Sequence, residues 1–336
     1  MIAVLEQLVS GRNLAEQEAA ELLSALTATD YPPALAGAVL AALRAKGETE
    51  DELRGFARAM RRLALRPTLP KDKVLVDTCG TGGDRSGSLN ISTGVALLSA
   101  ACGLLVAKHG NRSVSSRAGS ADVLEQLGLA LPADEDAAGR LLDRTGFTFL
   151  FAPHFHPAMR SLAPVRRALG IRTVFNMLGP LTNPAEPQYQ LVGAFSPEAA
   201  GLLALTFSGL PLERAYVVHG HDGWDEATPT GPFLLFDVRP GFVERSVRDP
   251  ADYGIPRCSP EDLRGGDAAE NAAALVAALT GRLGAHRDAL VLGTALVLEL
   301  TGTVRQPVMA ARAAAEAIDD GRAARLLGQL NGVLHA

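Results

Sequence analysis

The sequence is poor in cysteine, in aromatic residues and in positive charge. Its 336 residues include three cysteines and 5% aromatic residues, and 32 Lys and Arg are outnumbered by 37 Asp and Glu. Cys79, Cys102 and Cys258 lie far apart and form no CxxC pair, which argues against a disulfide framework or a zinc site and fits a reducing compartment. The net charge of -5 argues against a surface that binds nucleic acid or an anionic membrane.

Long apolar runs are also missing. No stretch reaches the roughly 20 apolar residues that a membrane-spanning helix needs. The first residues include Glu6 and lack the basic start and apolar run of a secretory signal. The apolar residues, 47% of the chain, are instead spread along it, which is enough for a sizeable core. We expect a cytoplasmic protein of about two domains, given a prior of ~150 residues per domain.

Residues 1–66 are predicted to form a small domain made only of helices. Asn13 with Glu16, and Thr49 with Glu52, have the spacing of a capping box at a helix start. Several of the predicted helices have wide apolar faces, so we expect this unit to bury surface against something else. A partner subunit is one candidate. Two prolines just after this segment mark a break in the chain.

Short apolar strands alternate with helices from residue 73 to residue 336. This alternation is typical of an α/β domain with a mostly parallel central sheet flanked by helices. A proline-punctuated helical segment from about 157 to 180 is expected to cross back and complete the small helical domain. The strand candidates are residues 74–76, 104–107, 147–151, 190–194, 215–218 and 233–238.

A glycine-rich loop, Cys79-Gly80-Thr81-Gly82-Gly83-Asp84, is placed just after the first predicted strand, which would end at Asp77. Glycines let the backbone approach a ligand closely and let successive N–H groups point at one anion. The loop leads to Asn90-Ile91-Ser92-Thr93 at a predicted helix start, where free amides favour an anion further. The spacing matches neither the Walker pattern nor GxGxxG. A tight strand-to-helix turn with no ligand is the alternative.

A second loop, Lys108-His109-Gly110-Asn111-Arg112, is predicted to follow the next strand and is rich in cations and hydroxyl groups. It continues into Ser113, Ser115, Ser116 and Ser120. Such donors suit an anionic, hydroxyl-rich ligand such as a sugar phosphate. A solvated polar turn is the alternative, since clusters of Ser, Asn and Gly are ordinary in loops.

Two further loops carry candidate ligand groups. Asp225 and Glu226 follow a predicted strand and offer oxygen ligands that suit magnesium, although a solvated acidic turn would look the same. The nearby histidines, His219 and His221, lack a third partner at zinc spacing. Arg166, on a predicted helix, could clamp a carboxylate through two parallel hydrogen bonds, or lie on an exposed helix face.

Taken in order, these motifs resemble the anthranilate phosphoribosyltransferase family. The resemblance covers nearly the whole chain, and it rests on an ordered set of motifs and not on one loop. The family motifs present are Gly-Thr-Gly-Gly-Asp, Asn-Ile-Ser-Thr, Lys-His-Gly-Asn-Arg, Phe-Ala-Pro…His-Pro, Asn176-Met-Leu-Gly-Pro-Leu-Thr-Asn183-Pro and His219-Gly-His-Asp-Gly-Trp-Asp-Glu226.

The resemblance implies transfer of a phosphoribosyl group from phosphoribosyl diphosphate to the amine of anthranilate, in a homodimer joined through the helical domain. Magnesium is the implied cofactor, bound by Ser92, Asp225 and Glu226. Gly80, Asn111 and Arg166 would face anthranilate. The residues that would hold phosphoribosyl diphosphate are Gly80, Gly83, Asp84, Ser88, Asn90, Ile91, Ser92, Thr93, Lys108, His109, Gly110, Asn111, Arg112, Ser113, Val114, Ser115, Ser116 and Ser120.

No general base is assigned, because the proton of an aromatic amine becomes acidic only as the new bond forms. The sequence departs from the family pattern at Arg85, Leu89, Arg117 and Trp224, and none of these removes an implied ligand. Two other functions compete. One is a pyrimidine nucleoside phosphorylase-like enzyme, which shares the architecture, and the other is a non-catalytic relative that binds nucleic acid or a metabolite.

Overall fold

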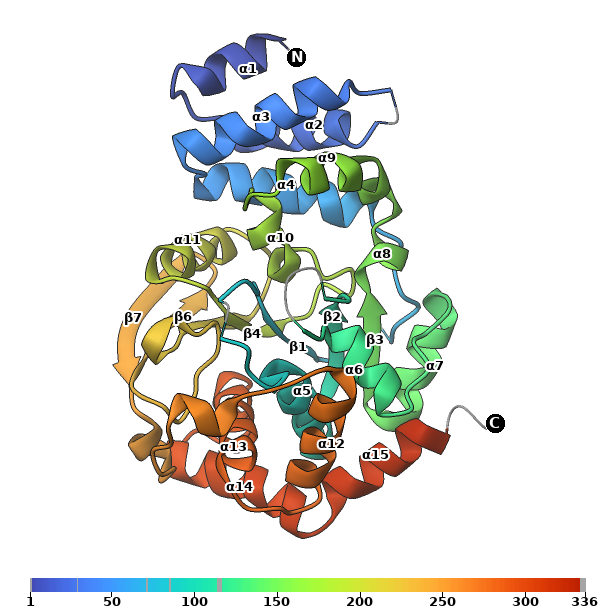
Figure 1. Cartoon of the computed structure of the whole chain (residues 1–336), viewed down its shortest axis with the longest axis vertical. Helices are drawn as coiled ribbons and strands as arrows, with labels where there is room; N and C mark the ends of the chain where they lie inside the picture. Colours follow the sequence, from blue (N-terminus) through green and yellow to red (C-terminus); the bar gives the residue numbers. More distant parts are fainter. Residues whose placement is uncertain (1, 29, 71, 85, 114–116, 333–336) are drawn as a thin grey trace.

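The computed structural model describes residues 2–28, 30–70, 72–84, 86–113 and 117–332, and it places a small helical domain on one end of a larger α/β domain (Figure 1). Among the described residues, no helix is both long and apolar enough to cross a membrane. The helical domain begins with α1 (Ile2–Val9), α2 (Glu16–Leu26), α3 (Pro33–Lys46) and α4 (Glu50–Leu63).

The start of α4 is capped as the sequence predicts. The Glu52 N–H donates to the Thr49 hydroxyl at 3.4 Å, and the Thr49 N–H donates to Glu52 Oε2 at 2.9 Å. Glu52 is buried, and its second oxygen accepts from the Leu14 N–H at 2.9 Å. Lys46 of α3 pairs with the same carboxylate at 3.0 Å. One side chain thus joins α3 and the segment before α2 to α4.

The capping box expected at Asn13 and Glu16 is wrong. α2 begins at Glu16 with Ala15 as its cap residue, and the Ala15 N–H donates to the Glu18 carboxylate at 2.8 Å. The Asn13 side-chain oxygen instead accepts from Lys46 Nζ at 2.9 Å. A contact between residues far apart in the sequence has replaced the local one.

A later segment of the chain packs against these first helices. Leu162 and Val165 are buried in one cluster with the core of α3, and Ser161 Oγ donates to Thr27 O at 3.1 Å. Figure 1 shows α9 lying across the helical domain above α10. The segment comprises α8 (Ala152–Phe155), η1 (Pro157–Leu162), α9 (Ala163–Leu169) and α10 (Phe175–Leu181).

The α/β domain is built on a sheet with the strand order β3-β2-β1-β4-β5-β6-β7. β1 to β5 run parallel, and β6 and β7 extend the sheet in antiparallel pairs. The mostly parallel α/β domain with a helical domain, predicted from the sequence, is confirmed. The strands are β1 (Leu75–Gly80), β2 (Leu105–Gly110), β3 (Phe147–Phe151), β4 (Tyr189–Gly193), β5 (Arg214–His219), β6 (Phe233–Arg239) and β7 (Phe242–Arg248).

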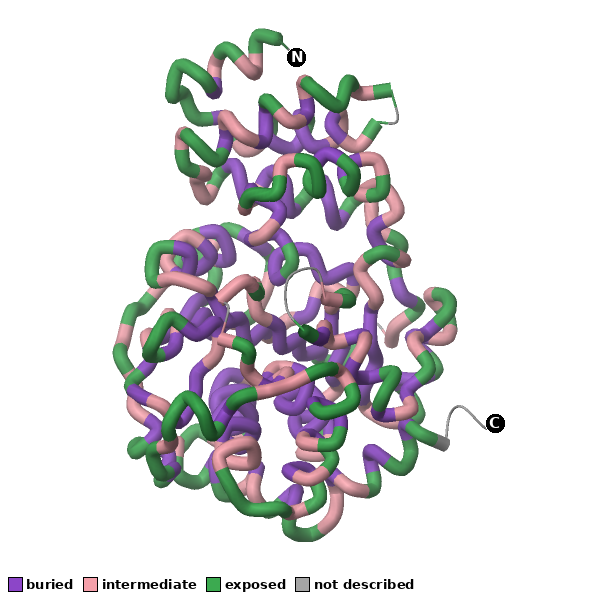
Figure 2. Tube along the Cα trace, viewed as in Figure 1, coloured by how far each residue is buried: buried purple, intermediate pink, exposed green. Residues whose placement is uncertain are grey.

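Helices cover both faces of the sheet, and buried residues fill both interfaces (Figure 2). α13 is buried along most of its length, from Ala289 to Leu300. One face carries α5 (Ile91–Ala101), α6 (Ser120–Gln126), α12 (Ala268–Leu279), α13 (Ala285–Leu300), α14 (Pro307–Asp319) and α15 (Arg322–Gly332), and the other carries α7 (Glu135–Thr145), α10 and α11 (Pro197–Ser208). Short 3-10 turns are η2 (His221–Gly223), η3 (Pro250–Tyr253) and η4 (Pro260–Leu263).

Two strands are longer than the sequence predicts. Asp77 does not end β1, because the strand continues in parallel register with β4 until Gly80 pairs with Gly193. Lys108 to Gly110 belong to β2, where they pair with β3, and not to the loop after it. Polar residues in a parallel strand keep their backbone hydrogen bonds while their side chains find buried partners, so polarity alone did not mark the strand ends.

Candidate active site at the carboxyl ends of the parallel strands

A buried lysine lies beneath the loops that leave the sheet. Lys108 of β2 is 2% exposed, and its ammonium donates to Thr78 O on β1 and to Ser92 Oγ at the start of α5, 3.4 Å away. A buried charge needs compensation. Burial raises the pKa values of Asp77 and Glu226, and the positive charge of Lys108 opposes both shifts, which shows that the two carboxylates lie within its field.

Two adjacent carboxylates connect the acidic loop after β5 with the glycine loop and with α5. Asp225 Oδ2 accepts from the Gly82 N–H at 2.6 Å, and Glu226 Oε1 accepts from the Ser92 N–H at 3.0 Å. The first turn of α5 is thereby occupied by a carboxylate, as the positive end of a helix favours. Residues from three strand ends therefore converge at one place, above Lys108.

Close packing around Asp225 explains two glycines at the strand ends. A Cβ built on Gly80 would lie 2.5 Å from Asp225 Oδ2, and one built on Gly193 would lie 1.5 Å from Asp225 O. Neither glycine has a positive φ. These glycines are therefore needed for the close approach of the acidic loop and not for a special backbone conformation.

The carboxylates repel one another. Burial and the neighbouring charges of Asp84 and Glu226 raise the pKa of Asp225 well above its usual range. Burial also raises the pKa of Glu226 to about 7, although Lys108 opposes this shift. Bound cations relieve such repulsion, so the local electrostatics fit a positively charged ligand.

The carboxylates do not by themselves form a metal cage. Within the described ranges, no group of three His, Cys, Asp or Glu side chains has the arrangement to hold a metal ion. Magnesium, however, is usually held by one or two carboxylates, with waters and ligand phosphates completing its octahedron. Asp225, Glu226 and the Ser92 hydroxyl fit this incomplete kind of site.

The glycine loop is held at Thr81 and bends sharply after it. The Thr81 N–H donates to Gly193 O at 2.9 Å, and the Thr81 hydroxyl accepts from the Phe195 N–H at 3.1 Å. Gly82 and Gly83 have φ values of 68° and 81°, which disfavour any side chain. The loop backbone is therefore held in a conformation that only glycine adopts without strain.

The polar residues after this bend are linked to the segment before α6. Ser86 and Ser88 share a hydroxyl contact of 3.1 Å, and the Ser86 N–H donates to Asp84 Oδ1 at 3.2 Å. Asn90 donates from Nδ2 to Ala118 O at 3.1 Å. Asp84 and Ser88 therefore lie in the stretch that connects the bend with α5, and Asn90 joins the start of α5 to the segment that follows β2.

The segment after β2 is only partly available to a ligand. Ser120 Oγ donates to Asn111 O at 3.2 Å, which ties Asn111 to the start of α6. The Arg112 guanidinium forms ion pairs with Glu125 at 2.6 Å and with Asp122 at 3.0 Å, so the structure turns this expected ligand toward α6. The predicted residues Val114, Ser115 and Ser116, and the departure at Arg85, lie outside the described residues.

Other predicted residues have a packing role. The side chains of Ile91 and Thr93 are buried in α5. His109 Nδ1 lies 3.1 Å from Gly179 O, and its ring meets that of His156 edge-on at 5.1 Å. Burial lowers the pKa of His109 to about 3 and that of His156 to about 4, so both imidazoles are neutral near pH 7.

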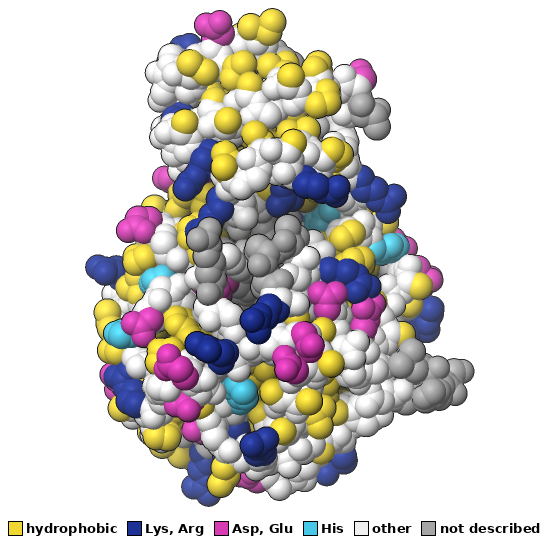
Figure 3. All heavy atoms as spheres, viewed as in Figure 1, with side chains coloured by type: hydrophobic (Ala, Val, Ile, Leu, Met, Phe, Trp, Pro, Cys, Tyr) yellow, Lys and Arg dark blue, Asp and Glu magenta, His cyan; other side chains and the backbone are white. Residues whose placement is uncertain are grey.

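Arg166 lies on α9, in the segment that reaches down from the helical domain. Its guanidinium is 5.0 Å from the centre of the Phe175 ring. The side chain is open to solvent, yet the protein around it lowers its pKa by desolvation. Lys and Arg side chains gather on this face of the molecule, where the helical domain meets the α/β domain (Figure 3).

Arg172 is a residue that the sequence analysis missed. It lies between α9 and α10, donates from Nη2 to Gly83 O at 2.7 Å, and stacks on the Phe195 ring at 4.4 Å. The helical segment that carries Arg166 is thus fastened to the glycine loop. The only signal in the sequence was its place just before the Asn176–Pro184 motif.

The sequence analysis also missed a buried pair, Asp77 and Asn183, which lies under the site. Asp77 is fully buried and accepts from the His109 N–H at 3.3 Å and from Asn183 Nδ2 at 2.8 Å. Asn183 also donates to Ala107 O at 2.8 Å. This pair locks the Asn176–Pro184 motif against β1 and β2, which gives that motif a structural role.

Comparison with known proteins adds independent information. Residues 2–64 match the family described as "Glycosyl transferase family, helical bundle domain", and residues 72–324 match "Glycosyl transferase family, a/b domain". An anthranilate phosphoribosyltransferase from Moorella thermoacetica is 47% identical over 97% of this chain and 96% of its own length. One from Rubrobacter xylanophilus is 45% identical over 95% and 93% of the two chains.

Solved structures agree with this comparison. The crystal structure of anthranilate phosphoribosyltransferase from Thermus thermophilus superposes with a TM-score of 0.91 at 41% identity, covering 99% of both chains. The enzyme from Saccharomyces cerevisiae in complex with PRPP and Mg superposes with a TM-score of 0.89 at 26% identity, over 98% and 96% of the chains.

Proposed function

This chain belongs to the anthranilate phosphoribosyltransferase family, and on that basis we propose that it joins anthranilate to the sugar of phosphoribosyl diphosphate. The reaction gives N-(5-phosphoribosyl)anthranilate and diphosphate, a step of tryptophan biosynthesis. The observation that carries the proposal is the convergence of Asp225 and Glu226 on the amides of Gly82 and Ser92, directly above buried Lys108. The comparisons lend no support to the nucleoside phosphorylase or the non-catalytic alternative.

The cofactor is Mg2+, which Asp225, Glu226 and Ser92 would hold. The mutual repulsion of the carboxylates supports this assignment, because it leaves buried Asp225 and half-buried Glu226 short of positive charge. When bound with the diphosphate, the ion neutralises charge that develops on the leaving group. The structure of the yeast enzyme with PRPP and Mg supports the same cofactor.

The glycine loop and the start of α5 would hold the diphosphate. Gly82 and Gly83 bend the backbone so that ligand oxygens can approach closely, while Asp84, Ser88 and Asn90 lie along the continuing loop. Lys108 places a fixed positive charge beneath the site. The remaining predicted contacts, at Gly110, Asn111, Ser113 and Ser120, would come from β2 and the segment after it, whereas the side chains of His109 and Arg112 already have partners in α10 and α6.

Anthranilate would enter between the glycine loop and the segment that carries Arg166. Arg166 would pair with the carboxylate, with Asn111 and the Gly80 backbone beside the ring. The contact of Arg172 with Gly83 O supports this placement, because it brings the α9–α10 segment against the glycine loop. The yeast enzyme in complex with 4-fluoroanthranilate, at 25% identity, is one solved relative of this chain that holds an aromatic ligand of this class.

The chain's own residues act by position and charge. As the glycosidic C–O bond lengthens, the ribose gains positive charge and the diphosphate gains negative charge. Lys108, held by Thr78 O and Ser92 Oγ, would supply a preorganised positive charge beneath the leaving group. The amine then attacks C1, and its proton becomes acidic as the C–N bond forms. His109 and His156 are neutral and enclosed, so we assign neither as a general base.

We also propose the assembly and domain boundaries. The helical domain would comprise residues 1–66 completed by about 157–180, and the α/β domain residues 73–336. Ile2 and Val9 of α1 are 71% and 72% exposed, and apolar side chains gather on the visible face of the helical domain (Figure 3). A homodimer through this domain would cover them. The three free cysteines fit a cytoplasmic location.

One assay tests the proposed reaction. Purified protein is mixed with anthranilate, phosphoribosyl diphosphate and Mg2+, and the loss of anthranilate fluorescence is followed. We expect the loss to need all three additions and to stop when EDTA removes the metal. Phosphate-dependent release of thymine from thymidine, with no loss of anthranilate, would instead support the phosphorylase. Light scattering after gel filtration tests the dimer.

A further inference from the structure

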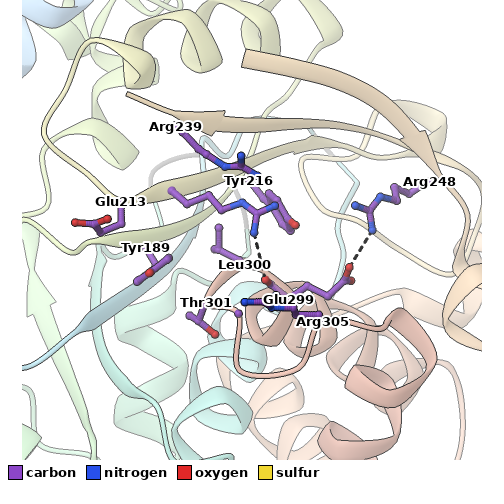
Figure 4. Close-up of a pocket in the computed structure, with 11 residues that line it drawn as sticks. Tyr189, Glu213, Tyr216, Arg239, Arg248, Glu299, Leu300, Thr301 and Arg305 are labelled. Carbon is purple, nitrogen blue, oxygen red and sulfur yellow. Dashed lines mark hydrogen bonds and ion pairs between the residues drawn. The ribbon is translucent and has the colours of Figure 1, made fainter. Parts of the chain in front are cut away.

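A cavity of about 520 Å3 lies away from the carboxyl ends of the parallel strands (Figure 4). Part of its wall comes from the opposite ends of the same strands. Tyr189 and Arg214 are the first residues of β4 and β5, whereas the candidate active site follows their last residues. Since a strand rises ~3.3 Å per residue, the six residues of β5 separate the two regions by roughly 17 Å.

Arginines dominate the charged lining of this cavity. Arg214, Arg239, Arg248 and Arg305 all line it, although the chain as a whole is acidic. Guanidinium groups bind carboxylates and phosphates through paired N–H donors. Four of them around one cavity point to an anionic ligand, provided that acidic neighbours leave some of the charge uncompensated.

Two of these arginines share a single carboxylate. Arg214 donates to Asp237 through two parallel bonds, Nε to Oδ1 at 2.7 Å and Nη2 to Oδ2 at 2.6 Å. Arg239 donates from Nη2 to the same Asp237 Oδ2 at 3.1 Å. One negative charge therefore faces two positive charges, and most of the Arg239 donors stay free in an exposed side chain.

A third arginine has no acidic partner. Within the described residues no ion pair or hydrogen bond involves the Arg305 side chain, which is exposed in the turn between α13 and α14. Arg248 is paired, because its Nη1 donates to Glu299 Oε2 at 3.1 Å. Glu213 offsets one charge at the exposed rim. With Asp237, Glu299 and Glu213 set against the four arginines, the wall keeps one net positive charge.

Glu299 holds Arg248 in place at the cavity wall. The Glu299 side chain is 6% exposed, and Arg248 Nη1 donates both to its Oε2 at 3.1 Å and to the Tyr253 hydroxyl at 3.0 Å.

We propose that this cavity binds a small phosphate monoester. The phosphate lies among Arg214, Arg239 and Arg305, where the donors of Arg239 and Arg305 that no acidic group takes pair with its oxygens. A phosphate monoester presents three terminal oxygens to these guanidinium groups, whereas a carboxylate presents only two. The site is separate from the phosphoribosyl transfer site, and the proposal does not depend on the reaction proposed above.

Equilibrium dialysis with radiolabelled glycerol 3-phosphate tests the proposal on the full chain. Because the carboxyl-edge site can also take a phosphate, the number of bound molecules per chain is counted. The wild type should show one class of binding site that depends on Arg239 and Arg305. In the double variant Arg239→Ala/Arg305→Ala, glycerol 3-phosphate should bind to this site at least tenfold more weakly or not at all, since each substitution removes charged donors. Both side chains are exposed, so the variant should fold normally.

A charge-matched control uses Arg245→Ala/Arg282→Ala, two exposed arginines outside the cavity lining. This control should bind like the wild type. Equal binding by all three proteins, or equal loss in both double variants, would overturn the proposal. So would a wild type that binds no glycerol 3-phosphate. The assay involves no turnover, so any of these results leaves the proposed reaction untouched.

Discussion

A methyl group added at Gly80 should damage the magnesium and diphosphate site although no charged residue is replaced. In Gly80→Ala the new Cβ would lie 2.5 Å from Asp225 Oδ2 and 3.2 Å from its Cγ. Because non-bonded heavy atoms prefer ~3.5 Å or more, the carboxylate must retreat by about 1 Å. The 2.6 Å bond from the Gly82 N–H to the same oxygen would then be lost.

The size of the effect follows from that bond. A hydrogen bond to a charged group contributes ~1.5–3 kcal/mol, which corresponds to roughly a ten- to hundred-fold change. We expect the catalytic efficiency kcat/KM for phosphoribosyl diphosphate to fall by that factor, and the Mg2+ concentration for half-maximal rate to rise. Anthranilate fluorescence in matched titrations measures both quantities, and a thermal melt confirms that the variant folds.

Gly328→Ala is the matched control. Gly328 lies in α15, far along the chain from the site, and a Cβ there meets nothing within 4 Å. It adds the same methyl group and should leave both titrations unchanged. If folded Gly80→Ala shows wild-type kcat/KM and metal dependence, the close approach of Asp225 to the glycine loop does not matter for function and the reasoning fails.

Other predictions address neighbouring residues. Arg166→Ala should raise the KM for anthranilate roughly ten- to hundred-fold; an unchanged KM in steady-state kinetics would reject the carboxylate pairing. Asp225→Asn with Glu226→Gln should raise the Mg2+ requirement steeply, and a metal titration identical to that of the wild type would refute it. Arg172→Ala should raise the KM for phosphoribosyl diphosphate several-fold by freeing Gly83 O, with partial recovery in Arg172→Lys, whereas equal kinetics of all three proteins would contradict the role. Because the pKa of Glu226 is raised to about 7 in the folded chain, metal-free stability should fall as pH rises from about 4.5 to 7, since the folded state holds the proton that the unfolded state releases. The difference in melting temperature between the wild type and Glu226→Gln isolates this carboxyl from the histidines, whose lowered pKa values act in the opposite direction.

The fold was predictable because its elements carry local signals. The apolar strand at Phe147–Phe151 and the capping box at Thr49 and Glu52 were found correctly from the sequence alone. β7 was missed because this edge strand is mostly exposed and mixes charges with apolar residues. Exposed, charged edge strands resist edge-to-edge association, and the same composition hides them from a search for apolar runs.

The site was only partly predictable, for a physical reason. Loop composition identified the glycines, the lysine and the carboxylates, since each residue type suits a particular ligand. Long-range contacts were not readable, so the bond from Arg172 to Gly83 O and the buried pair of Asp77 and Asn183 were missed. The pairing of Arg112 with Glu125, which turns an expected ligand away, likewise depends on how α6 folds back.

A crystal structure of the protein with phosphoribosyl diphosphate and Mg2+ would test the central claim most directly. The account predicts the diphosphate between the glycine loop and the first turn of α5, with the metal density against Asp225 and Glu226. Diphosphate density elsewhere, with these two carboxylates still bound only to Gly82 and Ser92, would contradict it.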